Sequence, residues 1–342
     1  MTANNNKPQL RNSSIELLRI LCMMCIIGHH IIINVLSVNF QYPIYTFVDS
    51  LMHVAVIVFV LITGYYGIHF RLHKVFALEA ELIYYSVLAS AVALLVFHSI
   101  HIKDMVMSFF PVTKHVYWFM SAYMELYLAS PLINRLLEKL SKRQFIYMLL
   151  VIGFSYSVLF TGDTYNAGTN LTGFTFLYVL GRYIKCYPVY DNIKTNSFLI
   201  CLALYTMLVL GCSFLPTTGR IFPHFVNWFY LYNGVGIIFF GVVVFGLFSR
   251  WTFFSPIINK MAKSVLAIYL IHENHAISQY IYVKPMQYLH NYLQIGGGLS
   301  MIILIVLITL VCIAIDQIRI LFFRYLPFEK LEQKFTSVIN KI

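Results

Sequence analysis

Charge is what this sequence has least of. Asp, Glu, Lys and Arg make up 11% of its 342 residues, while 60% are hydrophobic. A soluble domain typically carries about 25% charged residues, so this shortage excludes an ordinary soluble protein. The chain also lacks Pro- or Gly-rich linkers, low-complexity tracts and repeats of solenoid period. We therefore expect one integral-membrane domain.

Two further absences exclude other classes. There is no basic run interleaved with aromatic residues, so the net charge of +11 does not indicate a nucleic-acid partner. Attraction to anionic membrane lipid explains that charge instead. The first apolar run is too long for the hydrophobic region of a signal peptide, so we expect it to remain in the mature protein.

Cysteine is also scarce, and it lies mostly inside apolar runs. The six residues are Cys22, Cys25, Cys186, Cys201, Cys212 and Cys312. Buried cysteine behaves as a small hydrophobe, so we assign no disulfide framework. The first two form a C-x-x-C pair, but no second ligand pair lies nearby, and the redox or metal interpretation is therefore the weaker one.

Long apolar runs are what the sequence contains in abundance. Ten are candidates for crossing about 30 Å of hydrocarbon, and they cover approximately residues 14–36, 46–68, 75–99, 116–137, 145–160, 171–187, 196–214, 226–248, 263–283 and 297–322. The fold class is therefore all-α, a polytopic integral membrane protein with about ten transmembrane helices. We place the transmembrane domain at 14–325, between an N-terminal tail over 1–13 and a C-terminal tail over 326–342.

The basic residues predict the orientation of these spans. Twenty of the 24 Lys and Arg residues fall on one side, and the four on the other are Lys103, Lys114, Arg220 and Lys284. Short cytoplasmic loops hold an excess of Lys and Arg. Both termini and the loops 138–144, 188–195 and 250–262 are therefore predicted to be cytoplasmic.

Ionisable side chains interrupt the first apolar run, where they are costly and must face protein or water. Arg19 and His30 are close to three helical turns apart, so they share a face about 16 Å apart along the axis. Glu16 lies one turn below Arg19. His29 points about 80° away, so its loss should matter far less. His30 is too deep to reach headgroups, which favours a functional pocket over a snorkelling Arg19 and a structural histidine.

The spacing Arg19-x10-His30, preceded by IELL, resembles the acyltransferase-3 family, membrane-bound enzymes that O-acylate bacterial glycans. Similar segments follow in the family's order: VFVLITGYYG with basic RLHK after it, YWFMSAYMELYLASPLI, YVLGRYI, YLIHENH and DQIR. Thr63 replaces the family's usual serine but keeps the hydroxyl. The resemblance covers about residues 14 to 325. It implies a multi-pass protein of a bacterial plasma (inner) membrane, in the form without an additional extracytoplasmic domain.

The resemblance implies transfer of an acyl group, acetyl in the simplest case, from cytoplasmic acetyl-CoA to a hydroxyl of a cell-surface or lipid-linked polysaccharide. Imidazole is neutral and basic near physiological pH, so His30 is the candidate general base. Arg19, Arg71 and Lys74 are candidates for the donor's phosphates, although the positive-inside bias explains the last two equally well.

Other candidates are open to two interpretations. Thr63, Gly64 and Tyr65 could form the wall of the donor pocket, but a packing glycine would look identical. His272 is either a second pocket histidine or a partner in an interhelical hydrogen bond, and Glu125 either lines the acceptor path or pairs with a neighbour.

Two local patterns carry their own predictions. The segment HENH lacks the spacing of a zinc motif, so we expect no metal. Asp316 and Arg319 are one turn apart and should form a local ion pair.

A transporter or flippase of a glycan precursor is the alternative function, because many spans and buried charges suit it equally. Against it, no matched pair of Gly- or Pro-broken spans and no inverted repeat is apparent. The acceptor stays open, since exopolysaccharide, teichoic acid, peptidoglycan and a lipid-linked repeat unit all fit. A longer acyl donor fits as well.

Overall fold

Helices are the only regular secondary structure in the part of the chain that the structure describes. This computed structural model describes residues 12–35, 42–112, 116–159, 169–217 and 221–328, together with residues 330, 333 and 337. Lys7, Arg11, Lys114, Arg220 and most of both predicted tails lie outside these residues. The predicted all-α class is confirmed.

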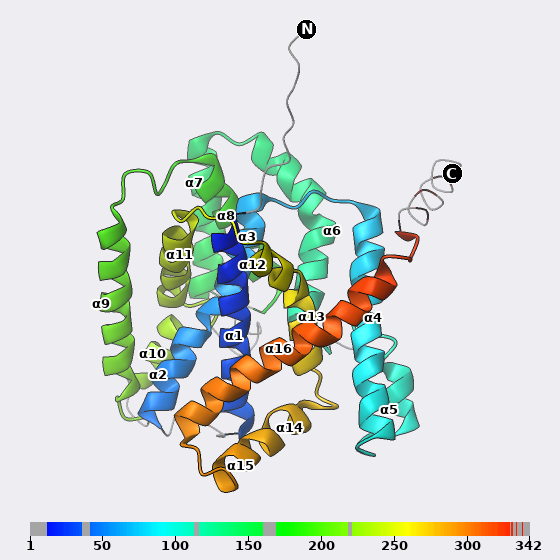
Figure 1. Cartoon of the computed structure of the whole chain (residues 1–342). Coiled ribbons are helices and arrows are strands. Elements are labelled where there is room, and N and C mark those ends of the chain that lie inside the picture. The colour runs from blue at the N-terminus through cyan, green and yellow to red at the C-terminus, as the bar shows by residue number, and fades with distance from the viewer. Residues whose placement is uncertain are drawn as a thin grey trace.

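The helices pack into a bundle (Figure 1). The longer ones are α1 (Ser13–Val35), α2 (Pro43–Met52), α3 (Val54–Tyr66), α4 (Leu72–Leu95), α6 (Trp118–Glu138), α7 (Lys142–Phe154), α8 (Leu171–Cys186), α9 (Thr195–Ser213), α11 (Val235–Ser249) and α16 (Gly297–Phe323). The shorter ones are α5 (Ile102–Met107), α10 (Phe222–Phe229), α12 (Pro256–Met261), α13 (Val265–His272), α14 (Ser278–Ile281) and α15 (Val283–Asn291).

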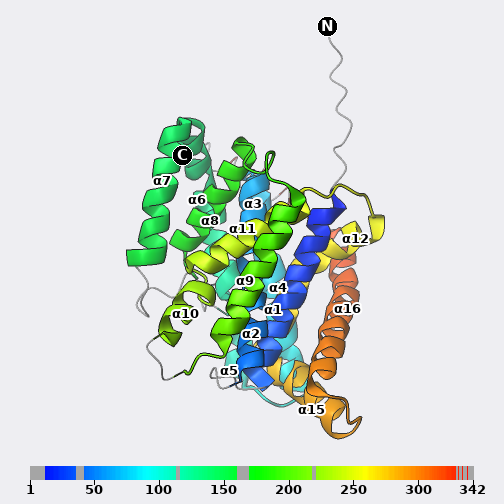
Figure 2. The same cartoon turned by 90° about the vertical axis from the view of Figure 1, so that its left-hand side faces the viewer.

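Within the described residues, five helical segments are long and apolar enough to cross a membrane: α1, the α2–α3 segment, α4, α9 and α16. The count of ten spans stays a prediction. Helix α9 lies on the outside of the bundle, packed against α2 and α11 (Figure 2), and exposes a row of large apolar side chains such as Leu204 and Met207. Such a surface suits contact with lipid.

The loops that join the helices gather at two ends of the bundle. Helix α1 begins and α16 ends at the same end, where α3, α6 and α8 also finish (Figure 1). Helices α5, α14 and α15 lie at the opposite end. The distribution of basic residues assigns the loops 138–144, 188–195 and 250–262 to one side of the membrane. In the structure these loops lie at one end of the molecule.

Several apolar runs that the sequence predicts as continuous are broken. The run at 226–248 divides into α10 and α11, and the run at 263–283 into α13 and α14. A turn at His53 also separates α2 from α3. Non-helical backbone at membrane depth is tolerated where it is buried in protein or lines a cavity, and residues at two of these breaks, His53 and Tyr232, line a cavity.

Helix α1 is central because its start is anchored and its sides are packed. Asn12 caps it by accepting from the Ser14 amide at 3.1 Å, and the Ser13 amide donates to the Phe253 carbonyl at 3.0 Å. The apolar side chains of Ile27 and Ile31 are fully buried. Helices α2, α3, α11, α13 and α16 all pack against α1, so the polar side chains in its middle, His29 and His30, lie among other helices.

Two glycines let α3 and α8 lie against one another. A Cβ atom at Gly64 would lie 2.2 Å from the carbonyl oxygen of Tyr178, and one at Gly181 would lie 2.5 Å from that of Leu61. Helix α3 continues unbroken through Gly64 to Tyr66. Gly64 is therefore a packing glycine, the simpler of its two interpretations.

Candidate active site

A cavity of about 680 Å³ opens between α1, α3, α4, α6 and α13. Pockets for small ligands usually measure about 300–1,000 Å³, so this one can hold part of a cofactor-sized molecule. Its lining includes Glu16, Arg19, His29, His30, Met52, His53, Thr63, His69, Lys74, Glu81, Trp118, Phe119, Tyr123, Tyr232 and Tyr269. Arg19 and His30, which the sequence places on one helical face, thus share one cavity.

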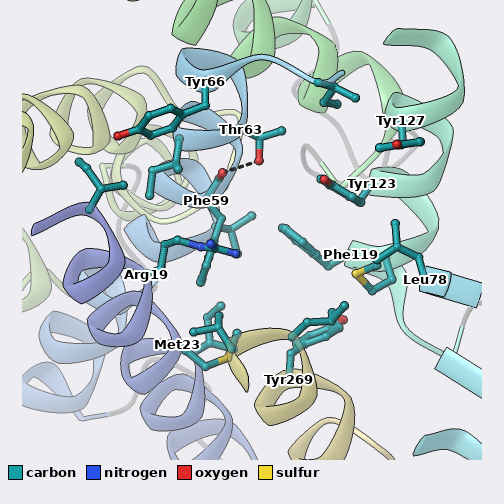
Figure 3. Close-up of a pocket in the computed structure, with 18 of the residues that line it drawn as sticks. Arg19, Met23, Phe59, Thr63, Tyr66, Leu78, Phe119, Tyr123, Tyr127 and Tyr269 are labelled. Carbon is teal, nitrogen blue, oxygen red and sulfur yellow. Dashed lines mark hydrogen bonds between the residues drawn. The ribbon is translucent and has the colours of Figure 1, made fainter. Parts of the chain in front are cut away.

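Arg19 is one of the cations that line this space. Its side chain extends from α1 toward Phe119 and Tyr123 of α6 (Figure 3). One guanidinium nitrogen lies 3.3 Å from the Glu16 carboxylate, and 37% of the side chain stays exposed. This ion pair leaves most of the guanidinium's donors available for a ligand.

The other residues predicted for the donor site divide into two groups. Thr63 and Lys74 line the cavity, and the Thr63 hydroxyl donates to the Phe59 carbonyl at 3.0 Å (Figure 3). Gly64 and Tyr65 do not line it, because Gly64 faces α8 and the Tyr65 ring packs 5.1 Å from that of Phe245.

Arg71 also lies outside the cavity lining. Its side chain is exposed, and its backbone is held by Tyr127, whose hydroxyl accepts from the Arg71 amide at 3.1 Å. It stands three residues before Lys74 and two after His69, both of which line the cavity. Arg71 is therefore beside the opening rather than within it.

His30 has a carboxylate partner that the sequence did not assign to it. Its Nδ1 atom pairs with the carboxylate of Glu273, directly after the last residue of α13, and both side chains are nearly buried. A carboxylate can only accept, so the proton of this contact is on Nδ1 and the Nε2 atom of the neutral ring is an acceptor. This arrangement orients an imidazole as a base, as a carboxylate does in hydrolytic triads.

The signal for Glu273 was present in the segment YLIHENH, where it follows His272 directly. His272 itself is fully buried behind His30, with ring centroids 5.4 Å apart. Its Nδ1 lies 2.5 Å from the Ile268 carbonyl of its own helix, and its Nε2 has no hydrogen-bond partner among the described residues. It is not part of the cavity lining, so His272 packs beside His30 without facing the cavity.

Glu125 is not brought into the site. Helix α6 turns Phe119, Tyr123 and Tyr127 toward the cavity (Figure 3), and Glu125 is two residues from both tyrosines, about 200° around the helix. Its side chain is exposed. The structure thus offers no support for a role of Glu125 on the acceptor path.

The predicted ion pair of Asp316 and Arg319 is present as part of a larger cluster. The Arg319 Nε donates to Asp316 at 2.7 Å, and the guanidinium lies 3.3 Å from Glu81, which lines the cavity. The Tyr85 hydroxyl also donates to Asp316 at 2.6 Å. These contacts join α4 to α16 behind the cavity wall.

Sequence reasoning missed a second polar cluster, which involves α1 and α2. His29 also lines the cavity, and its Nδ1 lies 2.7 Å from Asp49 of α2. Within the described residues, two groups of side chains bring possible metal ligands within 4.8 Å of one another: His29, Asp49 and His53, and His30, His272 and Glu273. In all four histidines Nδ1 contacts an oxygen atom, so Nε2 is the ring nitrogen left for any other partner.

Comparison with protein families decides the class of protein. The acyltransferase-3 family model, described as an acyltransferase domain, matches residues 12–316, nearly the whole chain. The chain belongs to the acyltransferase-3 family. It is therefore an acyltransferase with membrane helices, as its motifs predicted, and the alternative of a transporter gains no support from the match. No curated protein and no solved structure matches the chain in the same comparisons.

Proposed function

We propose that this member of the acyltransferase-3 family transfers an acetyl group from cytoplasmic acetyl-CoA to a hydroxyl of a cell-surface or lipid-linked polysaccharide. The observation that carries the proposal is the continuity of one cavity, which joins Arg19 and Lys74 to His30. A donor needs cations for its phosphates and a base beside its thioester. Both kinds of group line the same space here.

Charge and depth suggest how the donor lies. Arg19 precedes His30 by eleven residues on α1, which is about 16 Å along the helix axis. The pantetheine arm of acetyl-CoA is long and thin, so phosphates bound near Arg19 and Lys74 allow the thioester to reach His30. Phe59, Phe119 and Tyr269 line the space between and offer apolar walls to such an arm.

The chemistry requires one base. The acceptor hydroxyl loses its proton to Nε2 of His30 while its oxygen attacks the thioester carbonyl carbon. The carbon–sulfur bond then breaks, CoA leaves as a thiolate, and the imidazolium returns the proton to that sulfur. Glu273 stays ionised throughout and stabilises the imidazolium that forms in between.

Arg19→Ala is expected to weaken binding of CoA to the purified protein by about tenfold or more, because a charge-assisted phosphate contact is lost. Lys74→Ala should weaken it less, since that side chain is exposed and screened. Isothermal titration calorimetry in detergent measures both. Arg135→Ala is the matched control, because Arg135 is exposed at the end of α6 and does not line the cavity. Equal affinities for all three variants would contradict the donor site.

The proposed orientation puts both chain termini and the loop between α8 and α9 in the cytoplasm. In a background without the native cysteines, Asn192→Cys should be protected from an impermeant thiol reagent in intact cells, and Asn291→Cys, at the end of α15, should be labelled. The reason is the bias of basic residues toward the end of the bundle that holds residue 192. Labelling of residue 192 from outside would reverse the orientation.

A further inference from the structure

A second histidine–carboxylate pair, besides that of His30 and Glu273, presents its histidine to the cavity. His29 contacts Asp49 through Nδ1 at 2.7 Å, and the other carboxylate oxygen of Asp49 accepts from the Tyr230 hydroxyl at 2.6 Å. Asp49 is buried, with 3% of its surface exposed. Three elements, α1, α2 and the segment after α10, thus meet at one carboxylate, which is held by two hydrogen bonds.

These contacts determine which atom His29 presents to a ligand. Asp49 accepts hydrogen bonds, so the proton is on Nδ1 and the Nε2 atom of the neutral ring is an acceptor. His29 lines the cavity, and 15% of its side chain is exposed. A buried hydrogen bond of this kind adds little net stability compared with apolar packing. The more direct explanation of the pair is that Asp49 orients the Nε2 atom of His29 toward a ligand.

The position of His29 indicates what it binds. Its ring centroid is 5.2 Å from that of His30. Two imidazoles whose rings lie this close can each accept a hydrogen bond of about 2.7–3.0 Å from one of two hydroxyls on adjacent sugar carbons. Tyr232 and Trp118 line the cavity nearby, with ring centroids 5.6 Å apart, and aromatic faces offer a large apolar surface to the C–H groups of a sugar.

We propose that His29 is an acceptor-binding residue, whose Nε2 accepts a hydrogen bond from the hydroxyl next to the one that His30 deprotonates. The acceptor is then a sugar with two neighbouring free hydroxyls, held against Tyr232 and Trp118. Asp49 and Tyr230 are positioning residues, because they act through His29. This inference rests on the proposed function and specifies its acceptor.

The test separates transfer to a sugar from transfer to water. Purified protein receives radiolabelled acetyl-CoA and a membrane glycan fraction from a strain that lacks the gene, and both base-labile glycan esters and free acetate are measured. His29→Gln should lower the ratio of glycan transfer to hydrolysis by about tenfold, as expected for one lost hydrogen bond to the acceptor. His224→Gln is the matched control, because His224 is exposed on α10 and outside the cavity lining.

Two further variants test the role of the carboxylate. Asp49→Asn should lower the ratio as much as His29→Gln, because an amide can turn its NH₂ group toward Nδ1 and move the ring proton to Nε2. The double variant should be no worse than either single one, since both changes remove the same contact. Melting temperatures recorded alongside show that the folded protein is being compared.

Several results would overturn this inference. A parallel fall in transfer and hydrolysis would make the pair structural, and an unchanged ratio in His29→Gln would remove it from the acceptor site. Stoichiometric zinc in the purified protein that is lost in Asp49→Asn would make it a metal site. Esters found by NMR only on hydroxyls without a free neighbour would exclude the paired-hydroxyl acceptor. Absence of any transfer by the unmodified protein, in contrast, would overturn the proposed function itself.

Discussion

His30→Gln is expected to lower acetyl transfer per mole of folded protein by about 10²-fold or more, the usual range for a lost acid–base catalyst. Glutamine keeps some of the size and hydrogen bonding of histidine but cannot take the acceptor's proton. The measurement is ester formation on the glycan fraction from radiolabelled acetyl-CoA, with melting temperature recorded for each variant. CoA affinity is measured on the same sample to show that the donor still binds.

The choice of control for this experiment follows from the structure. The sequence favours His29→Gln, because an ideal helix turns His29 about 80° from the face of Arg19. The structure shows His29 lining the same cavity with a carboxylate of its own. The exposed His224 is therefore the appropriate control for both histidines. Near-normal turnover in His30→Gln, or lower stability with full activity in the folded fraction, would make His30 a structural residue.

Glu273→Gln is expected to lower transfer by about 10²-fold or more, close to the effect of His30→Gln. Replacing the carboxylate that orients a catalytic histidine by its amide costs up to about 10⁴-fold in hydrolytic triads, because the ring adopts the wrong tautomer. The Glu273 carboxylate contacts Nδ1 of His30 directly, so the same reasoning holds here. Transfer is measured as for His30→Gln.

A double variant that carries both Glu273→Gln and His30→Gln tests whether the two residues act together. Residues that act as one unit are strongly non-additive, so the double variant should lose little more than His30→Gln alone. Glu138→Gln is the matched control, because Glu138 is exposed at the end of α6. A Glu273→Gln protein that transfers at the normal rate, or a double variant whose loss is the product of both single losses, would separate Glu273 from the base.

The sequence by itself determined the class of protein and placed Arg19 and His30 on one helical face. Apolar runs long enough to span a membrane form helices, because lipid offers no hydrogen-bond partner for backbone polar groups. A periodic face on one helix was enough to join Arg19 and His30, since the contacts of a helical face depend only on residues a few turns apart. The motifs in their order along the chain identified the family, which the match to residues 12–316 confirms.

Only the tertiary structure decided which residues complete that site. Glu273 lies far from α1 in the chain and Asp49 lies on the next helix, and their pairing with His30 and His29 depends on how α13 and α2 pack against α1. The breaks after His272 and at His53 could not be read from apolar runs that continue across them. Glu125 lies outside the cavity lining for a related reason, because the rotation of a helix about its axis is set by its neighbours. The packing of other helices against α1 brings Glu273 to His30 and Asp49 to His29. Local spacing does not encode these contacts, so only the tertiary structure shows that two histidine–carboxylate pairs border one cavity.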